Sequence, residues 1–298
     1  MSRMQKTEKK VNKKYKSRSL WQEAFRRLLK NKGAIIGMLF LVILAAAAIV
    51  SGYIFDYDKV VIGQDIANRL QWPSAQHIFG TDDLGRDIFV RILYGARYSL
   101  IIGCGSVAIG LVLGVILGSL AGYYGGTVDH LVMRATDILY AIPNIMIAVV
   151  IVSLLGASTL NLLLALCVTC ATSFARIARA SVMTLRDQEY IEAAQAMGLP
   201  TWKIILKHVL PNTLAPIIVQ VTLLIGTTII AASSLSFLGI GVPSPAPEWG
   251  AMLSAGRSYI RTSSYICVIP GLAIMLTVLA LNLLGDGLRD ALDPKLKK

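Results

Sequence analysis

One segment carries side chains that could bind a metal ion. Between positions 77 and 87 lie one imidazole and three carboxylates, from His77, Asp82, Asp83 and Asp87. These groups are common ligands of divalent metals. The same residue types also form turns and cap helices, and an apolar run starts directly after Asp87. We therefore predict loop and capping roles for them, with a metal site as the alternative.

The cysteines form a second candidate for metal or redox chemistry. Cys167 and Cys170 make a CxxC pair. All four cysteines, including Cys104 and Cys267, fall in apolar runs or at their ends. A cysteine in such a run behaves as a small hydrophobic side chain. No histidine accompanies the pair. We predict packing roles and no metal, cofactor or catalytic residue in this chain.

Nucleotide-phosphate binding is the third chemistry to consider. The P-loop GxxxxGK[ST] requires the dipeptide Gly-Lys, which occurs nowhere in the sequence. The chain is therefore not expected to hydrolyse ATP by itself.

Long uncharged segments set the positions of all these residues. The 298 residues are 55% apolar with a mean hydropathy of +0.64, which is too hydrophobic for a soluble domain. A membrane-spanning helix needs about 20 apolar residues. The uncharged runs that reach this length cover residues 33–55, 98–128, 138–175, 209–247 and 262–285. The third run has room for two spans around a turn at 156–161, so we predict an all-α membrane protein with six spans.

Prolines and glycines interrupt two of these runs. The third span, predicted to begin near Asp137, contains Pro143-Asn144 and should be kinked or broken there. The fifth span is predicted near residues 215–233. It is followed by a segment rich in glycine and proline, residues 239–247, which cannot form another ordinary helix. We expect a rigid loop with a re-entrant portion within residues 236–257.

The distribution of lysine and arginine predicts how the chain is oriented in the membrane. With the N-terminus inside, 22 of the 29 basic residues lie on the cytoplasmic side, as the positive-inside rule requires. Basic flanks beside apolar spans suit anionic membrane lipid, so nucleic acid is not an expected partner. The prediction is a cell-membrane protein with both termini cytoplasmic. Its parts are a basic tail and interfacial helix (1–32), the first span (33–53), an extracytoplasmic segment (54–97), a core of helices 2–6 (98–285) and a C-terminal segment (286–298).

Two stripes of side chains stand out within the predicted spans. The second span has a glycine at every fourth position, at Gly110, Gly114, Gly118 and Gly122, which predicts close packing against another helix. In the fifth span, Gln220, Thr227 and Ser234 are seven residues apart. They either line a path for a hydrated solute or form hydrogen bonds between helices. No charge falls in the middle of a predicted span, whereas ion-coupled carriers generally need ionisable groups there.

A polar hairpin at residues 176–212 separates two apolar runs. Its central part, residues 189–212, predicts two short helices with a corner at Gly198-Leu199-Pro200, where glycine can adopt the left-handed cap. The first helix should present an apolar, mostly small face of Tyr190, Ala193, Ala194 and Met197. The second should present Trp202, Ile205, Leu206 and Val209 and end at Leu210-Pro211. A small-faced helix leaving the membrane predicts docking into a groove of another protein.

The hairpin resembles the EAA loop of ABC importer permeases. The residues that carry the resemblance are Glu192-Ala193-Ala194, Gly198 and Leu210-Pro211, while His208 departs from the general pattern, which favours isoleucine. Residues 80–100, GTDDLGRDIFVRILYGARYSL, and 284–298, LGDGLRDALDPKLKK, are similar to C-type subunits of dipeptide, oligopeptide and nickel permeases. This resemblance covers most of residues 70–298.

The resemblance implies the fold and partners of a type I ABC importer permease. A second permease subunit, two cytoplasmic ATPase subunits that bind ATP and Mg, and an extracytoplasmic solute-binding protein would complete the importer. The hairpin residues that would couple to an ATPase are Glu192, Ala193, Ala194, Gly198, Leu210 and Pro211. The implied substrates are dipeptides or oligopeptides, with nickel or a metal chelate as the alternative. A different class, an ATP-independent secondary carrier, is also kept open.

Overall fold

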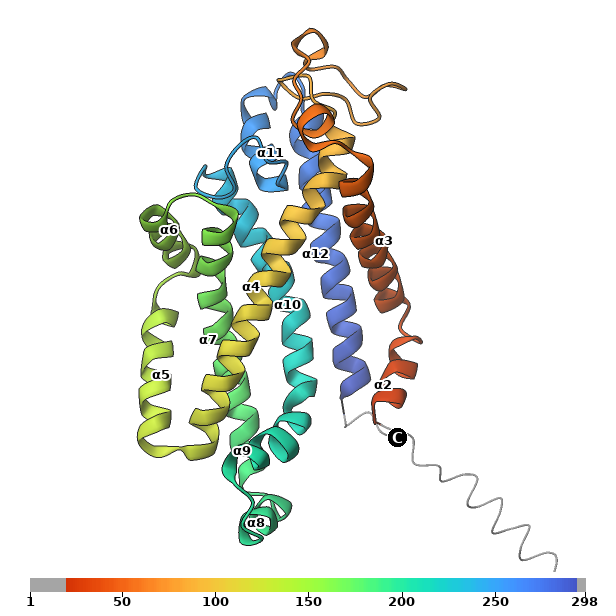
Figure 1. Cartoon of the computed structure of the whole chain (residues 1–298). Helices are drawn as coiled ribbons and strands as arrows, with labels where there is room; N and C mark the ends of the chain where they lie inside the picture. Colours follow the sequence, from red (N-terminus) through yellow and green to blue (C-terminus); the bar gives the residue numbers. More distant parts are fainter. Residues whose placement is uncertain (1–19, 294–298) are drawn as a thin grey trace, which may run out of the picture.

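Long helices dominate the structure. The computed structural model describes residues 20–293, and the elements of this part are helices, with one isolated bridge between Thr81 and Asp87. Five helices are long and apolar enough to cross a membrane (Figure 1). They are α3 (Lys32–Ile54), α4 (Ile88–Tyr124), α7 (Thr159–Arg186), the continuous helix Thr201–Phe237 and α12 (Tyr265–Leu292). The predicted all-α membrane fold is confirmed.

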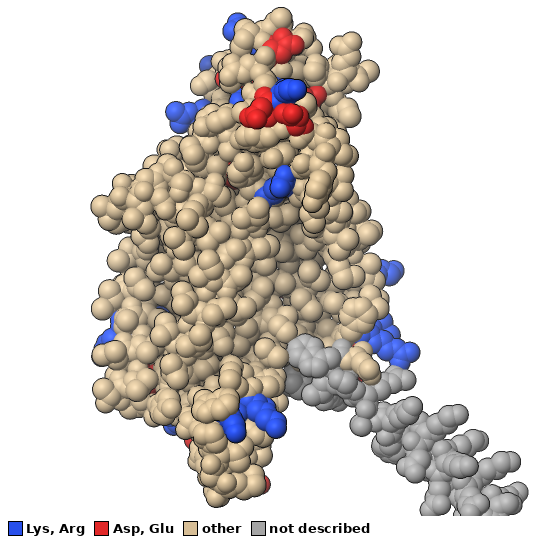
Figure 2. All heavy atoms as spheres, in the orientation of Figure 1, with Lys and Arg blue, Asp and Glu red and all other residues tan. Residues whose placement is uncertain are grey.

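The two ends of this bundle differ. One end, called the hairpin end below, carries α8 (Glu189–Ala196), which projects beyond the long helices (Figure 1). The opposite end, called the loop end, carries η1 (Tyr57–Val61), η2 (Ile66–Asn68), α11 (Trp249–Gly256) and η4 (Arg257–Tyr259). On the face shown in Figure 2, charged side chains gather toward these ends and the broad middle is almost uncharged. This distribution matches a membrane-embedded middle.

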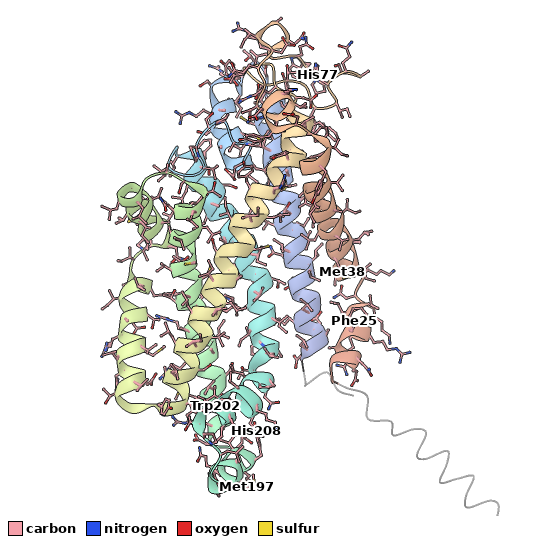
Figure 3. The ribbon with its side chains drawn as sticks, in the orientation of Figure 1. Phe25, Met38, His77, Met197, Trp202 and His208 are labelled. Carbon is pink, nitrogen blue, oxygen red and sulfur yellow. The ribbon has the colours of Figure 1, made fainter. Side chains whose placement is uncertain are left out.

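A short helix, α2 (Leu20–Leu28), lies where an interfacial helix was predicted. Leu28 is buried against Ala34 of α3 and Ala291 of α12, while Phe25 is exposed (Figure 3). The helix is thus attached to the bundle on one side and leaves an aromatic ring free on the other. The basic tail predicted for the first 18 residues lies outside the described residues.

The third predicted span differs from the expectation. The helix starts at Gly126 rather than near Asp137, as α5 (Gly126–Ala141), and α6 (Asn144–Leu155) follows it at an angle of 89°. The break at Pro143 was predicted. Pro143 has no N–H to donate, and Ile142 before it is extended, with φ of −93° and ψ of 131°. Residues 20–293 therefore contain five continuous helices that could span the membrane, and six candidate spans only if the bent pair counts as one.

The glycine stripe of α4 lies against α7. A Cβ atom at Gly110 would be 2.5 Å from the Cβ of Cys170, and one at Gly122 would be 2.8 Å from the carbonyl oxygen of Arg179. At Gly114 and Gly118 it would collide with the backbone of α7. The two backbones thus approach closely over three helical turns, which is the packing that the four-residue spacing predicts. It also accounts for Cys170, which is buried in this contact.

The acidic segment at the loop end uses its side chains for loop structure. Nε of Arg86 donates to the carboxylate of Asp82 over 2.7 Å, and both side chains are buried. Asp87 caps the first turn of α4 and lies 2.9 Å from Nδ1 of His77, near the tip of the loop end (Figure 3). In residues 20–293, no three His, Cys, Asp or Glu side chains converge as metal ligands would. The observed contacts are the predicted turn and capping roles.

The second loop-end segment, residues 236–257, is packed into the bundle. Its short helix α11 begins at Trp249, whose side chain is fully buried and donates from Nε1 to the carbonyl oxygen of Ile92 over 3.1 Å. Glu248 is fully buried too and accepts the backbone N–H of Ala251 at 2.8 Å. The first contact joins α11 to α4 and the second caps α11, so the segment between the last two spans is a folded part of the loop end.

Candidate functional site

The first hairpin helix, α8, ends in a glycine cap. Gly198 has a φ of +77°, the left-handed conformation that the sequence predicts. Its N–H bonds to the carbonyl of Gln195 over 2.9 Å, and the N–H of Leu199 bonds to that of Ala194 over 3.2 Å. This pair of bonds is a Schellman motif, which stops the helix and turns the chain. A Cβ at Gly198 would meet nothing within 4 Å, so the position requires glycine for its backbone rather than for space.

One face of α8 is fixed to the bundle. Ile191 and Ala194 are 0% and 1% exposed, respectively, in a cluster with Val182 of α7 and with Ile204 and Val209 of the following helix. Ala194 therefore packs inside this chain, unlike the prediction that it would face a partner together with Ala193. In addition, Nε2 of Gln195 donates to the hydroxyl of Tyr123 at the end of α4 over 3.0 Å. The hairpin is thus held by both α4 and α7.

The second hairpin helix also differs from the prediction. α9 (Thr201–Ile204) continues through the π-helical turn η3 (Ile205–Val209) into α10 (Leu210–Phe237), so Leu210-Pro211 does not end it. In η3 the N–H of Leu210 bonds to the carbonyl of Ile205, five residues back. This wider turn comes directly before Pro211, which has no N–H to offer the chain. The wider turn also changes which side chains share a face of the helix. Ile204 and Val209 are buried, while Trp202 and Leu206 are exposed.

Together these elements form a surface that we call the hairpin face. Its apolar members are Tyr190, Met197, Trp202 and Leu206, with exposed fractions of 43%, 73%, 60% and 58%. Met197 lies at the tip and Trp202 nearer the bundle (Figure 3). Ala193 and charged Glu192, Lys203 and Lys207 are exposed beside them. Aromatic and Met side chains framed by charges are the composition of protein-binding surfaces.

The predicted path residues lie along α10. Thr227 is exposed and Gln220 and Ser234 are half-buried. The hydroxyl of Thr227 donates to the carbonyl of Leu224 over 3.1 Å, and that of Ser234 to Ile230 over 2.8 Å. Within the described residues, neither hydroxyl bonds to another helix. Ser234 also lines an open groove between α10, α11 and α12, with Phe237, Leu253 and Ile274 among its walls.

Two ion pairs near the hairpin end were not predicted. Asp129 of α5 forms a bidentate pair with Arg179 of α7, and Asp137 pairs with Arg176 over 2.8 Å. The third span was expected to start near Asp137, which left Asp129 outside the predicted helix. Asp129 and Asp137 are eight residues apart, which places both on one side of a helix. This spacing was the signal in the sequence that could have predicted ion pairs with a neighbouring helix.

A bundle of long apolar helices with a protruding helical hairpin defines a multi-pass membrane protein. The chain belongs to the family described as binding-protein-dependent transport system inner membrane component, whose model matches residues 114–298. The N-terminal transmembrane domain of oligopeptide transport permease C matches residues 19–73. The resemblance stated from the sequence is therefore confirmed.

Relatives with similar sequences are transport permeases. A dipeptide transport system permease protein of Alkalihalophilus pseudofirmus is 48% identical, over 95% of this chain and 92% of that protein. A glutathione transport system permease protein of Pectobacterium atrosepticum is 45% identical, over 94% and 93% of the two chains. One of Escherichia coli O157:H7 is 46% identical, over 94% and 92%.

Solved structures show the same fold. An inward-facing structure of the MetNI methionine ABC transporter superposes with a TM-score of 0.56 at 21% identity, covering 69% of this chain and 96% of that chain. At this identity the similarity concerns the fold alone. It confirms the type I importer permease architecture of the helical bundle.

Proposed function

We propose that this chain is the transmembrane subunit of an ATP-driven importer for dipeptides or other short peptides. It forms half of the translocation path beside a second permease subunit. Two ATPase subunits bind ATP and Mg at the hairpin end, and an extracytoplasmic solute-binding protein delivers substrate at the loop end. Both termini are then cytoplasmic, as the distribution of basic residues indicates.

The observation that carries this proposal is the two-sided construction of the hairpin. Ile191 and Ala194 fix α8 to the bundle, while Met197, Trp202 and their neighbours present an exposed hairpin face. A structure that is rigidly attached on one side and exposed on the other can transmit movement of a bound partner to the spans. Glu192, Ala193 and Gly198 lie on the exposed side and contact the ATPase, while Ala194 supports them from within.

The residues of α10 supply the proposed path. Thr227 and Ser234 satisfy their hydroxyl hydrogens on their own helix, so each oxygen can still accept a hydrogen bond from a passing solute. Gln220 continues the stripe toward the hairpin end. The path is completed by the second permease subunit facing α10.

Short peptides are the favoured substrates because the similar relatives are named for a dipeptide and for glutathione, a small peptide. The test is reconstitution with the partner subunits in proteoliposomes. We expect uptake of a labelled dipeptide that requires ATP on the hairpin side and binding protein on the loop side. Uptake of Ni²⁺ in place of the peptide would contradict the substrate assignment. Uptake without the ATPase subunits would contradict the importer mechanism and indicate a secondary carrier.

A further inference from the structure

An open crevice lies between α3 and α4 near the loop end. The two helices meet where the hydroxyl of Ser51 approaches the carbonyl of Leu93 at 3.4 Å. Toward the hairpin end α3 leaves α4 and packs on α12, where Gly37 lies against the backbone of Ala280 (Figure 1). The crevice has a volume of about 440 Å³. Its walls are Ala45, Ala48, Ile49, Gly52 and Tyr53 of α3, and Arg97, Leu100 and Ile101 of α4.

The one charged side chain of the crevice is Arg97. Its guanidinium crosses onto α3 at Gly52, where a Cβ atom would collide with it, and lies 5.0 Å from the ring centre of Tyr94. Within the described residues it has no carboxylate partner and no hydrogen bond, whereas its neighbours Arg86 and Arg91 lie beside Asp82. A guanidinium that lacks a carboxylate partner can bind the oxygen atoms of an anion in a bidentate arrangement. The crevice therefore has a place for an anion.

The depth of Arg97 indicates which anion fits. Lys32 begins α3, and Gly52 follows 20 residues later, which corresponds to about 30 Å of helix. This equals the thickness of the hydrocarbon core, so Arg97 lies at the headgroup level of the leaflet on the loop side. Ala45 lies about 10 Å deeper, among acyl chains. The crevice is polar where a lipid headgroup would be and apolar below it.

We propose that this crevice binds an anionic phospholipid, with its phosphate on Arg97 and one acyl chain between Ile49 and Ile101. A guanidinium matches phosphate oxygens in a bidentate arrangement. None of the residues that line the crevice is a carboxylate, so the ammonium of a zwitterionic headgroup would find no partner there. The proposal concerns a structural lipid and does not depend on the transported substrate.

Native mass spectrometry of the full chain in mild detergent tests the site. Phosphatidylglycerol or phosphatidylcholine is added, and the bound lipids are counted. The variants are Arg97→Gln, Ile49→Trp, which fills the crevice, and the control Arg261→Gln, an exposed arginine on the same side. We expect the parent and the control to prefer phosphatidylglycerol. Both crevice variants should retain at least about fivefold less phosphatidylglycerol than the parent.

Three results would overturn the proposal. Equal retention of the two lipids by the parent would show that the site does not select an anion. Unchanged phosphatidylglycerol binding in Arg97→Gln or in Ile49→Trp would show that the lipid binds elsewhere. Loss of the lipid when the parent chain is assembled with its partner subunits would show that a protein helix, rather than lipid, covers the crevice.

Discussion

Nε2 of Gln195 in the hairpin donates a hydrogen bond to the hydroxyl of Tyr123, 72 residues earlier, over 3.0 Å. Tyr123 lies at the end of α4, whose first turn begins at the loop end with Ile88. A continuous helix of 37 residues, about 55 Å long, thus connects the loop end to α8. The bond thus joins the hairpin to a helix that extends to the opposite end of the bundle.

Tyr123→Phe removes this bond and little else. An exposed hydrogen bond contributes about 0.5–1.5 kcal/mol, so we expect normal folding with a twofold to roughly tenfold weaker stimulation of ATP turnover by substrate. Turnover is measured in proteoliposomes that contain the complete importer. Tyr124→Phe is the matched control because, within residues 20–293, the hydroxyl of Tyr124 makes no hydrogen bond and its ring contacts only that of Tyr123. Equal stimulation in the parent and Tyr123→Phe would remove Tyr123 from the coupling path.

Gly118→Leu tests the contact between α4 and α7. The new side chain would meet the backbone of Ala175, and overpacking a close contact costs about 1–3 kcal/mol or more. We expect a lower melting temperature in detergent and a lower yield of folded protein. Leu117→Phe, on the exposed side of the same turn, should behave like the parent. A normal melting curve for Gly118→Leu would mean that the two helices can separate without cost.

Asp129 and Arg179 should depend on each other for stability. Asp129→Asn leaves the Arg179 guanidinium without its bidentate partner, and charge-assisted bonds of this kind contribute about 1.5–3 kcal/mol. Since the pair is partly exposed, the lower end of that range is expected. Adding Arg179→Gln should recover part of the loss. Thermal unfolding of both single variants and the double variant measures the coupling, and strictly additive effects would contradict it.

Labelling tests the orientation. The four native cysteines are replaced, and single cysteines are introduced at Asp65, Ser258 and Gln195, which are all exposed. An impermeant maleimide should label the first two in intact cells and Gln195 only after the cells are opened. Labelling of Gln195 in intact cells would reverse the topology and place the hairpin face outside.

Local signals in the sequence predicted the parts of the site that depend on local geometry. The left-handed cap at Gly198 follows from glycine next to Leu-Pro, and the break at Pro143 follows from a missing N–H. The close approach of another helix to α4 follows from four glycines at one spacing, because small side chains alone allow it; that this helix is α7 does not follow from the spacing.

Other features depend on interactions that the sequence pattern does not contain. Ala193 and Ala194 are the same residue type, and only packing against Val182 decides that Ala194 is the buried one. The π-helical turn of η3 places Ile204 on the buried face and leaves Leu206, which the sequence grouped with Val209, exposed. A constant helical period cannot predict this change. The contact between Tyr123 and Gln195 depends on the tertiary arrangement of α4 and α8.

If the hairpin face binds an ATPase, substitutions on that face should weaken the binding. Glu192→Lys reverses a charge on that face, and Gly198→Val strains a φ of +77°, which costs a β-branched residue about 1 kcal/mol or more. Gly198→Asn is the matched control because asparagine tolerates the left-handed conformation and a Cβ there has free space within the chain.

The most direct measurement is the affinity of the ATPase subunits for the purified chain in detergent. We expect about tenfold weaker binding or worse for Glu192→Lys and Gly198→Val, with unchanged helix content, and a smaller loss of binding for Gly198→Asn than for Gly198→Val. Parental affinity in both Glu192→Lys and Gly198→Val, together with normal peptide uptake, would contradict the role of the hairpin as the coupling element.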